Sequence, residues 1–354
     1  IIHGTTLATN ALIERKGAKT ALITTKGFRD VIEMRTESRF EQYDLNLVMP
    51  LPLISRNDRY VIEERISANG NVLIPINETE VTELIKTLKT KNYQSIAIGF
   101  IHSYSNNSHE KWLRKILLKQ LPNTMISISS DVSPQMREYE RFNTVCANAY
   151  VQPMMKSYLI RLQTLLTKQK ILCSIFLMHS GGGIISLKNA TEYPVRLIES
   201  GPAGGAVFAA TIAKKHNIKN IVSFDMGGTT AKICLIKNQK PKTSRVFEVA
   251  RSYRFKKGSG MPISIPVIDM VEIGAGGGSL SYVDDLQQIR VGPQSAGSRP
   301  GPACYGLGGT LPSVTDADLL LGKLSVEYFA GGSIKLNKEN AEKSLEVNIG
   351  SKLN

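Results

Sequence analysis

The sequence predicts an α/β protein with two domains. Short apolar runs alternate with amphipathic helical stretches through the first half of the 354 residues, and strands that alternate with helices of about 10–15 residues favour a largely parallel sheet. The composition changes after about residue 195, and glycine becomes dense beyond residue 258. We therefore expect one domain over residues 1–194 and a second over residues 195–354, in line with a prior of about 150 residues per domain.

The expected elements of the first half follow from local patterns. Leu22 and Ile23 among threonines indicate a buried strand. Asn69-Gly70 indicates a hairpin, and Asn77 is a suitable cap for a helix. Strands are expected over residues 18–25, 59–66, 71–74, 95–100, 125–129 and 171–178. Helices are expected from residue 77, over 109–121 and over 139–168, the last interrupted by Pro153.

Composition excludes several classes of protein. Hydrophobic residues make up 42% and charged residues 21% of the chain, which is ordinary for a globular protein and excludes a disordered or collagen-like one. No apolar run approaches the ~20 residues that span a bilayer, and the first residues lack the pattern of a signal peptide. Four well-separated cysteines without a CxxC pair argue against a disulfide framework. We expect a cytoplasmic protein without a membrane partner.

A hairpin motif over residues 221–236 carries the sharpest functional signal. An apolar strand ends at Asp225, turns through Gly227, Gly228, Thr229 and Thr230, and returns as a second apolar strand. Glycine N–H groups and threonine hydroxyls can cradle phosphate oxygens, and the Asp225 carboxylate can hold a hydrated Mg²⁺ against them. The alternative is a plain β-hairpin with an Asx turn, but such a hairpin does not require the Asp, both glycines and both threonines together. The motif therefore predicts phosphate binding.

The formal net charge of +14 fits this interpretation. The basic residues are scattered, the longest cluster is the short one at 254–257, and aromatic residues make up only 6% of the chain. We expect attraction for small anions such as nucleotides and no nucleic-acid partner.

Two glycine-containing segments flank the hairpin motif. Upstream, residues 199–210 combine small residues, among them Gly201 and Gly204, with the start of a helix. This layout resembles the actin, Hsp70 and sugar-kinase superfamily, in which such a helix packs at an interdomain hinge; the alternative is a tightly packed helix start without a ligand. Downstream, an apolar stretch containing Asp269 and Glu272 leads into a turn.

That downstream turn consists of Gly276, Gly277 and Gly278. We expect it to face the phosphate hairpin within about 10 Å of Asp225, the span of a triphosphate and its waters. Asp269 and Glu272 would then be the nearest carboxylates for orienting the metal or a reacting water. A purely structural turn is the alternative.

An ordered series of motifs makes the resemblance specific. It comprises residues 3–11, 25–31, 137–141, 199–205, 225–230, 273–279, 291–297 and 299–306. The series resembles the hydantoinase A / 5-oxoprolinase family, in particular the ATP-dependent N-methylhydantoinase A type, over essentially the whole chain. The resemblance implies two ribonuclease-H-like domains of the actin-like ATPase kind, with ATP in the cleft between them.

The resemblance also implies a reaction. ATP hydrolysis would drive the opening of a cyclic amide through phosphorylation of the amide oxygen, with Mg²⁺ as the metal, Asp225, Glu272 and Asp269 as catalytic groups and a B-type subunit as partner. The alternatives are a 5-oxoprolinase, the ATP-binding subunit of a ketone carboxylase, or an inactive truncated remnant. Family members begin with an earlier phosphate loop and continue further, so we expect a chain incomplete at both ends. Many relatives also carry Asp where this chain has Lys232.

Four residues are candidates for substrate binding. His3, Thr5 and Thr6 precede a helix expected from about Ala8 and can bind an anion; the alternative is a simple N-cap. Arg137, together with Arg141, can clamp a substrate carboxylate or pair with its acidic neighbours on the surface.

Overall fold

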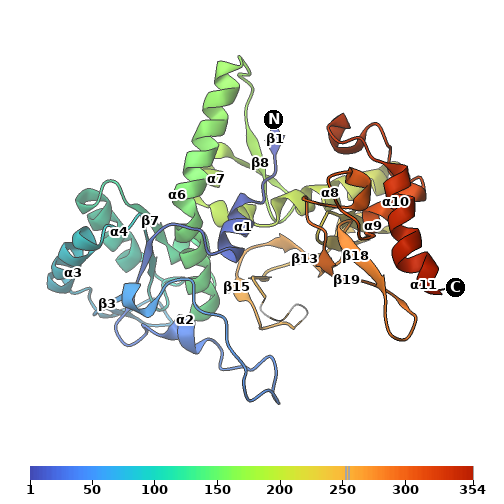
Figure 1. Cartoon of the computed structure of the whole chain (residues 1–354). Coiled ribbons are helices and arrows are strands. Elements are labelled where there is room, and N and C mark those ends of the chain that lie inside the picture. The colour runs from blue at the N-terminus through green and yellow to red at the C-terminus, as the bar shows by residue number, and fades with distance from the viewer. Residues whose placement is uncertain (252, 254–255, 354) are drawn as a thin grey trace. The chain divides into compact units, whose positions relative to one another are not determined.

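The computed structural model describes residues 1–251, 253 and 256–353, and the fold is a mixed α/β one (Figure 1). Arg254 and Phe255 of the basic cluster lie outside the described residues. The chain forms two compact units. The first comprises Ile1–Val207 and Thr243–Ile268, and the second comprises Phe208–Lys242 and Asp269–Asn354. The domain ranges 1–194 and 195–354 stay a prediction, because these units reflect spatial contacts alone.

The first unit is built on a four-stranded parallel sheet in the order β3-β2-β6-β7. The strands are β2 (Thr20–Thr25), β3 (Arg59–Ile62), β6 (Ser95–Gly99) and β7 (Met125–Ile128). Every residue of β2 is buried, as is every residue of β6, which is typical of a parallel sheet covered on both faces. The expected parallel sheet is thereby confirmed.

Helices cover both faces of this sheet. Ala21 and Ile23 share one apolar core with α3 (Glu78–Lys91) and α4 (Ser108–Gln120). Leu22, which points to the opposite face of the strand, shares a second core with α6 (Glu138–Lys168). The Asn77 side chain accepts hydrogen bonds from the first turn of α3, as its capping position predicts.

Three sequence-based expectations need correction. Pro153 does not interrupt α6, which runs through it; buried Ala149, Met155 and Leu159 anchor the helix on both sides of the missing N–H. Only the end of segment 171–178 is a strand, β8 (Phe176–Met178), which pairs with β1 (Ile2–His3) and β9 (Ile184–Ser186).

The third correction concerns segment 59–66. Its first half is β3, and only β4 (Arg65–Ile66) forms the expected hairpin with β5 (Val72–Ile74). Gly70 adopts a φ of +84° in the hairpin turn, a conformation that glycine accepts without strain. The remaining elements of the first unit are α1 (Leu7–Ile13), α2 (Val31–Met34), α5 (Ser129–Val132), α7 (Leu187–Glu192), β13 (Thr243–Ser244), β14 (Phe247–Val249), β15 (Met261–Ile263) and β16 (Val267–Ile268). Helix α8 (Ser200–Lys215) begins in this unit and ends in the second.

A buried polar network joins the start of α6 to the end of β6. The Arg141 guanidinium, fully buried, donates to the Phe100 carbonyl at 2.8 Å and to Glu138 at 3.1 Å. The neighbouring Glu110 carboxylate, also fully buried, accepts from the Phe100 N–H at 3.0 Å and from the Ser129 hydroxyl at 2.6 Å. Arg141 is therefore neither a surface ion pair nor a substrate clamp: its donors bind the protein itself.

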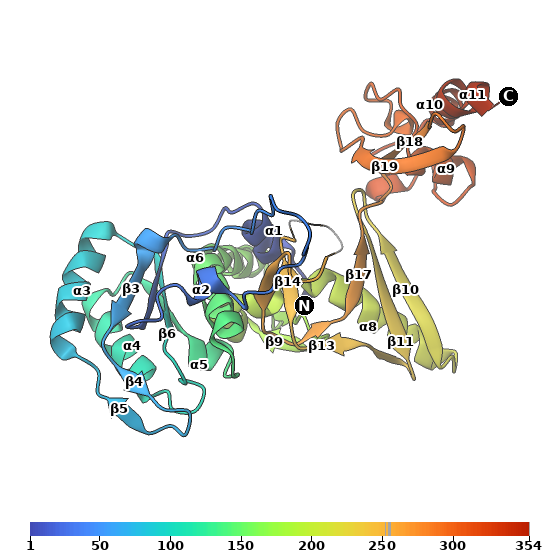
Figure 2. The ribbon, with the colours of Figure 1, turned by 90° about the horizontal axis from the view of Figure 1, so that it is seen from below.

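The second unit contains an antiparallel sheet and a small helical part. Strand β11 (Ala231–Lys237) pairs with β10 (Asn220–Met226), β12 (Lys240–Pro241) and β17 (Met270–Ile273), and Figure 2 shows β10, β11 and β17 side by side. The expected hairpin of residues 221–236 is confirmed. The helical part has its own core of Cys304, Leu319, Leu336 and Ala341. It contains β18 (Ser279–Val283), β19 (Ile289–Ser295), α9 (Val314–Leu320), α10 (Lys338–Leu345) and α11 (Ser351–Leu353).

Two further features concern the cysteines and the lengths of the helices. All four cysteines are free, and burial raises the pKa of the Cys146 thiol to about 12, which keeps it protonated and inert. Among the described residues, every helix is too short or too polar to span a bilayer.

Replacing Arg141 with methionine should lower the free energy of unfolding by about 3–5 kcal/mol. The half-buried Glu138 loses its ion-pair partner, and Ser129, which donates to the buried Glu110, loses the Arg141 donor. The matched control is Lys156→Met on the exposed side of the same helix, which should change stability by less than about 0.5 kcal/mol. Urea denaturation monitored by circular dichroism measures both. Equal effects of the two variants would contradict a structural role for Arg141.

Candidate functional site

The turn between β10 and β11 is open to solvent. The Gly227 N–H closes it by donating to the Thr230 carbonyl at 2.9 Å. Gly228 and Thr229 at its tip are exposed, and a Cβ built on Gly228 would meet no atom within 4 Å. The outer side of the turn therefore has room for a ligand, and its exposed N–H and hydroxyl groups suit an anion.

The predicted glycine turn lies directly against the hairpin turn. Gly277 N–H donates to the Gly227 carbonyl at 2.8 Å, and Gly278 N–H donates to the Gly228 carbonyl at 2.7 Å. A Cβ on Gly276 would lie 2.7 Å from the Gly227 oxygen, so only glycine allows this approach. The two motifs that the sequence placed together are thus hydrogen-bonded to each other, while their role in binding a ligand stays a prediction.

Three charged residues form a row across the sheet beside these turns. Asp225 on β10 is the register partner of Lys232 on β11, and Lys232 is the register partner of Glu272 on β17. Residues directly opposite each other in a sheet share a face. Asp225, Lys232 and Glu272 therefore alternate acid, base, acid on one face.

Asp269 is not part of this row. It lies three residues before Glu272, where its carboxylate pairs with the Lys242 ammonium at 2.7 Å. This hydrogen bond raises the pKa of Lys242. The structure thus places Asp269 in an exposed ion pair at the end of β17 away from the glycine turn, and only Glu272 lies in the same row as Asp225.

The oxygen-bearing side chains near the turns suit Mg²⁺ that is bound together with a phosphate group. Carboxylate and hydroxyl oxygens are hard ligands, and Asp225, Glu272, Thr229 and Thr230 offer only such groups. Among the residues that the structure describes, no three His, Cys, Asp or Glu side chains are grouped closely enough to enclose a metal ion. Mg²⁺ characteristically needs no such cage, because it keeps waters and binds one or two carboxylates together with phosphate oxygens.

In the first unit, the N-terminal motif is bound to the start of α8. Thr5 N–H donates to the Ser200 hydroxyl at 3.1 Å, and that hydroxyl donates to the Thr5 carbonyl at 3.0 Å. Gly4 lies against Gly201, where a Cβ on Gly4 would be 3.4 Å from the Gly201 Cα. Gly204 lies one turn further along α8, facing Met178. Motifs almost 200 residues apart in sequence are therefore neighbours.

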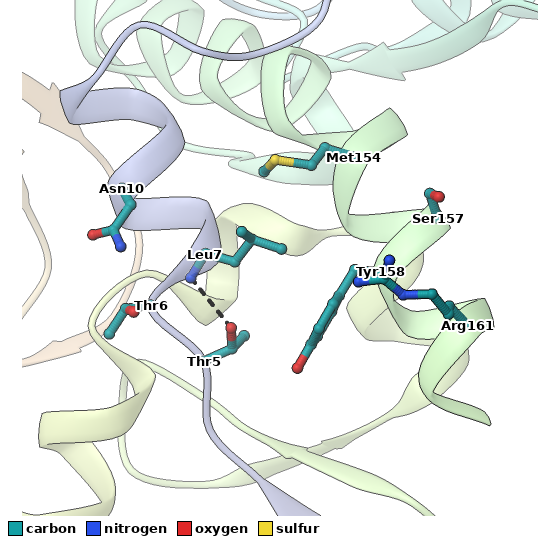
Figure 3. A pocket seen from close by; sticks show the side chains of 8 residues that line it. All are labelled: Thr5, Thr6, Leu7, Asn10, Met154, Ser157, Tyr158 and Arg161. Atoms are coloured by element: carbon teal, nitrogen blue, oxygen red, sulfur yellow. Dashed lines mark hydrogen bonds between the residues drawn. The ribbon is translucent and has the colours of Figure 1, made fainter. Parts of the chain in front are cut away.

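A pocket of about 530 Å³ opens beside this motif (Figure 3). Thr5 and Thr6 contribute to one side, and Tyr158 and Arg161 of α6 contribute to the other. The full lining consists of Thr5, Thr6, Leu7, Asn10, Met154, Ser157, Tyr158 and Arg161. His3 reaches it through Tyr158, since its Nε2 lies 2.7 Å from the phenol oxygen. The helix begins at Leu7, and its N–H donates to Thr5 Oγ1 at 3.2 Å, so Thr5 also has the local capping role.

Sequence reasoning missed the α6 side of this pocket. Tyr158, Arg161 and Ser157 recur at helical spacing on the exposed part of a long helix, a pattern that resembles any solvated face. Arg137, which sequence reasoning did select, lies elsewhere: it is exposed at the start of α6 with a φ of +77° and does not line the pocket.

The fold and these motifs define the class of protein. Residues 141–354 match the family described as hydantoinase/oxoprolinase, and residues 1–121 match the N-terminal region of the same family. The chain belongs to this hydantoinase/oxoprolinase family, as the motif series indicated.

Particular relatives are similar along nearly the whole chain. An uncharacterised protein of Methanocaldococcus jannaschii is 44% identical over 98% of this chain and 52% of its own length. The caprolactamase subunit alpha of Pseudomonas jessenii is 35% identical over 99% of this chain and 50% of its own length. The chain thus spans about half the length of these curated relatives.

Solved structures support the same grouping. The crystal structure of the ATP-dependent caprolactamase from Pseudomonas jessenii matches with a TM-score of 0.81 at 34% identity, covering 99% of this chain and 50% of that one. The nucleotide-free structure of acetone carboxylase, an enzyme of ATP-dependent acetone carboxylation, matches with a TM-score of 0.72 at 26% identity and the same coverage.

Replacing Gly276 with alanine should destabilise the second unit by about 1–3 kcal/mol, because the new methyl group must displace backbone atoms of the hairpin turn. Gly228→Ala is the matched control, since its methyl group points into open space. Thermal unfolding of both variants measures the difference. If Gly228→Ala is as destabilising as Gly276→Ala, close backbone packing between the turns does not explain the loss of stability.

Proposed function

We propose that this chain is the nucleotide-binding part of an ATP-dependent enzyme that opens a cyclic amide of the hydantoin or N-methylhydantoin type. The observation that carries the proposal is the hydrogen-bonded pair of glycine turns beside Asp225 and Glu272. Membership of the hydantoinase/oxoprolinase family and similarity to two proteins whose names or titles state ATP-dependent reactions support it. The proposal retains the actin-like arrangement of two ribonuclease-H-like domains that the motif order implies.

The proposed chemistry assigns distinct tasks to the residues of the second unit. In the proposed reaction the γ-phosphoryl group of ATP is transferred to the amide oxygen with release of ADP, which makes the amide carbon more electrophilic. One water adds to this carbon, the ring C–N bond breaks to leave an acyl phosphate, and a second water releases inorganic phosphate and the open-chain acid. The exposed Gly228 and Thr229 N–H groups and the Thr229 and Thr230 hydroxyls orient phosphate oxygens. Asp225 and Glu272 would hold Mg²⁺, and positioning together with charge neutralisation is the main contribution that a protein makes to phosphoryl transfer.

The pocket of the first unit is the proposed substrate site. Thr5, Thr6 and the His3–Tyr158 pair offer hydrogen-bonding groups to a ring amide, and Arg161 offers a charge for an acidic substituent. Its volume of about 530 Å³ is within the range of small-molecule sites, about 300–1,000 Å³.

Alternatives within the family share the nucleotide chemistry and differ in the acceptor. A lactam, 5-oxoproline or a ketone would each use the same pair of turns, and the names of the relatives include a caprolactamase and an acetone carboxylase. An inactive remnant is the remaining alternative. A second, B-type subunit is the proposed partner, since the caprolactamase relative is itself named a subunit.

Asp225→Ala should reduce ATP turnover by at least about 10²-fold in the complete enzyme, because a metal-held phosphate contact contributes several kcal/mol to the transition state. The control is Asp285→Asn on the β18–β19 hairpin, an exposed carboxylate of the same unit. Release of inorganic phosphate measures turnover. Turnover at the wild-type level in Asp225→Ala would exclude the assigned role.

Tyr158→Phe tests the pocket. It removes the hydroxyl bonded to His3. We expect KM for the ring substrate to rise about 3–10-fold with kcat nearly unchanged. This is the effect of losing one hydrogen bond that stabilises the bound ground state and the transition state equally. Tyr328→Phe, at a tyrosine that is 81% exposed in the second unit, is the control. A fall in kcat at constant KM would argue against a binding role.

A further inference from the structure

Strand β11 carries a lysine at the end nearest to the paired turns. The strands β10, β11 and β17, all of whose residues the structure describes, contain two basic residues, Lys232 and Lys237. Lys237 is the last residue of β11 and is the register partner of Asn220, at the end of the hairpin away from the turn. Lys232 is the second residue of β11. It is therefore the cation that these three strands place beside the proposed phosphate site.

Two carboxylates flank Lys232 across the sheet. Asp225 is its register partner on β10, and Glu272 is its register partner on β17. Both acidic residues are exposed, and Lys232 is half-buried between them. Opposite charges in register stabilise a sheet, so Lys232 has a structural role in this row. It also changes the formal charge of the row, because two negative groups and one positive group leave a single net negative charge.

This charge matters for an anionic ligand. A triphosphate beside two carboxylates is repelled by both, and a cation must offset the repulsion. Mg²⁺ does so when it is bound, because a metal ion is often the largest local charge in such a site. A lysine ammonium is the equivalent that belongs to the chain itself, since it binds phosphate oxygens as a compact point charge.

Lys232 lies close to the turn along the strand. Thr230, one of the proposed phosphate ligands, precedes it by two residues, which is about 7 Å along an extended chain. Residues two apart in a strand share a face, and the flexible four-carbon stem of lysine can extend its ammonium along that face. The Gly227 N–H closes the turn on the Thr230 carbonyl, so the exposed tip at Gly228 and Thr229 begins directly beyond this residue. A phosphate held at the tip is therefore within reach of the ammonium.

We propose that Lys232 is a phosphate-binding residue of this turn and that it allows the site to hold a nucleoside triphosphate without Mg²⁺. The ammonium offsets part of the charge of Asp225 and Glu272 and binds a phosphate oxygen at the same time. Lys232 contributes less once Mg²⁺ neutralises the two carboxylates. The inference rests on the proposed function of the turn as a phosphate site, and it adds to that function one further residue and its relation to the metal.

The test measures binding of the β,γ-imido analogue of ATP by isothermal titration calorimetry, in excess Mg²⁺ and separately in EDTA. Lys232→Met and Lys232→Gln both remove the charge and keep most of the side chain. We expect each to raise Kd in EDTA at least about tenfold, which is the effect of losing one charge-assisted hydrogen bond. In Mg²⁺ the same variants should raise Kd by no more than about threefold, because the metal neutralises the row. Lys232→Arg keeps the positive charge and should retain binding in EDTA.

Lys237→Met is the matched control. It makes the same substitution on the same strand and lowers the net charge of the chain by the same amount. Its position is five residues further from the turn, about 16 Å along the strand. Kd should therefore stay unchanged in both conditions, and circular dichroism of every variant checks that the fold is retained.

Three results would contradict this role of Lys232 and leave the proposed function intact. An equal loss of affinity with and without Mg²⁺ in the neutral Lys232 variants would show that the residue only supports the sheet. Unchanged affinity of these variants in EDTA, or binding by the unaltered chain in Mg²⁺ alone, would show that the lysine does not replace the metal. Absence of binding by the unaltered chain in both conditions would instead contradict the proposed function, and the inference with it.

Discussion

The second unit depends on the contact between the Gly227-Gly228 part of the hairpin turn and the glycine turn of residues 276–278, where main chain meets main chain. Gly227 and Gly228 present their carbonyls to Gly277 and Gly278 at 2.8 and 2.7 Å, and Gly276 leaves no space for even a methyl group. This contact fixes β17 beside β11 at the end where Asp225 and Glu272 lie in register. The density of glycine in this part of the sequence is therefore a requirement of packing as well as of ligand access.

In the first unit, the main internal contact is made by buried charged side chains and not by glycine. Burying an unpaired carboxylate or guanidinium is costly, and the cost is avoided only if every donor and acceptor is satisfied. Arg141 and Glu110 meet this condition by bonding the same residue, Phe100, through its carbonyl and its N–H respectively. The end of β6 is thereby fixed to α4 and α6 at once. Arg141, which the sequence pattern offered as part of a substrate clamp, instead stabilises the end of β6 inside the first unit.

Sequence patterns predicted the elements well where local chemistry decides them. The parallel strands, the Asn77 cap and the phosphate-type hairpin follow from short-range patterning, and the order of motifs identified the family. The failures have a common cause. The continuity of α6 through Pro153 depends on tertiary packing that overrides a local breaker. The ion pair of Asp269 with Lys242 joins two segments whose pairing no local spacing gives, and the catalytic role of Asp269 stays a prediction. The pocket wall at Tyr158 and Arg161 likewise depends on a helix that approaches from 150 residues away.

The hydrogen bonds of the glycine turn continue beyond the sheet. The Gly277 carbonyl accepts from the N–H of Thr315 at 2.8 Å, in the first turn of α9. Asp316, the next residue, is fully buried; it caps that helix through Ser313 and holds the Cys304 N–H at 2.7 Å. The tip of the hairpin is therefore joined to the core of the helical part by two main-chain hydrogen bonds, at Gly277, and by the side chain of Asp316. Any displacement of Gly227 must therefore either break one of these hydrogen bonds or carry α9 with it.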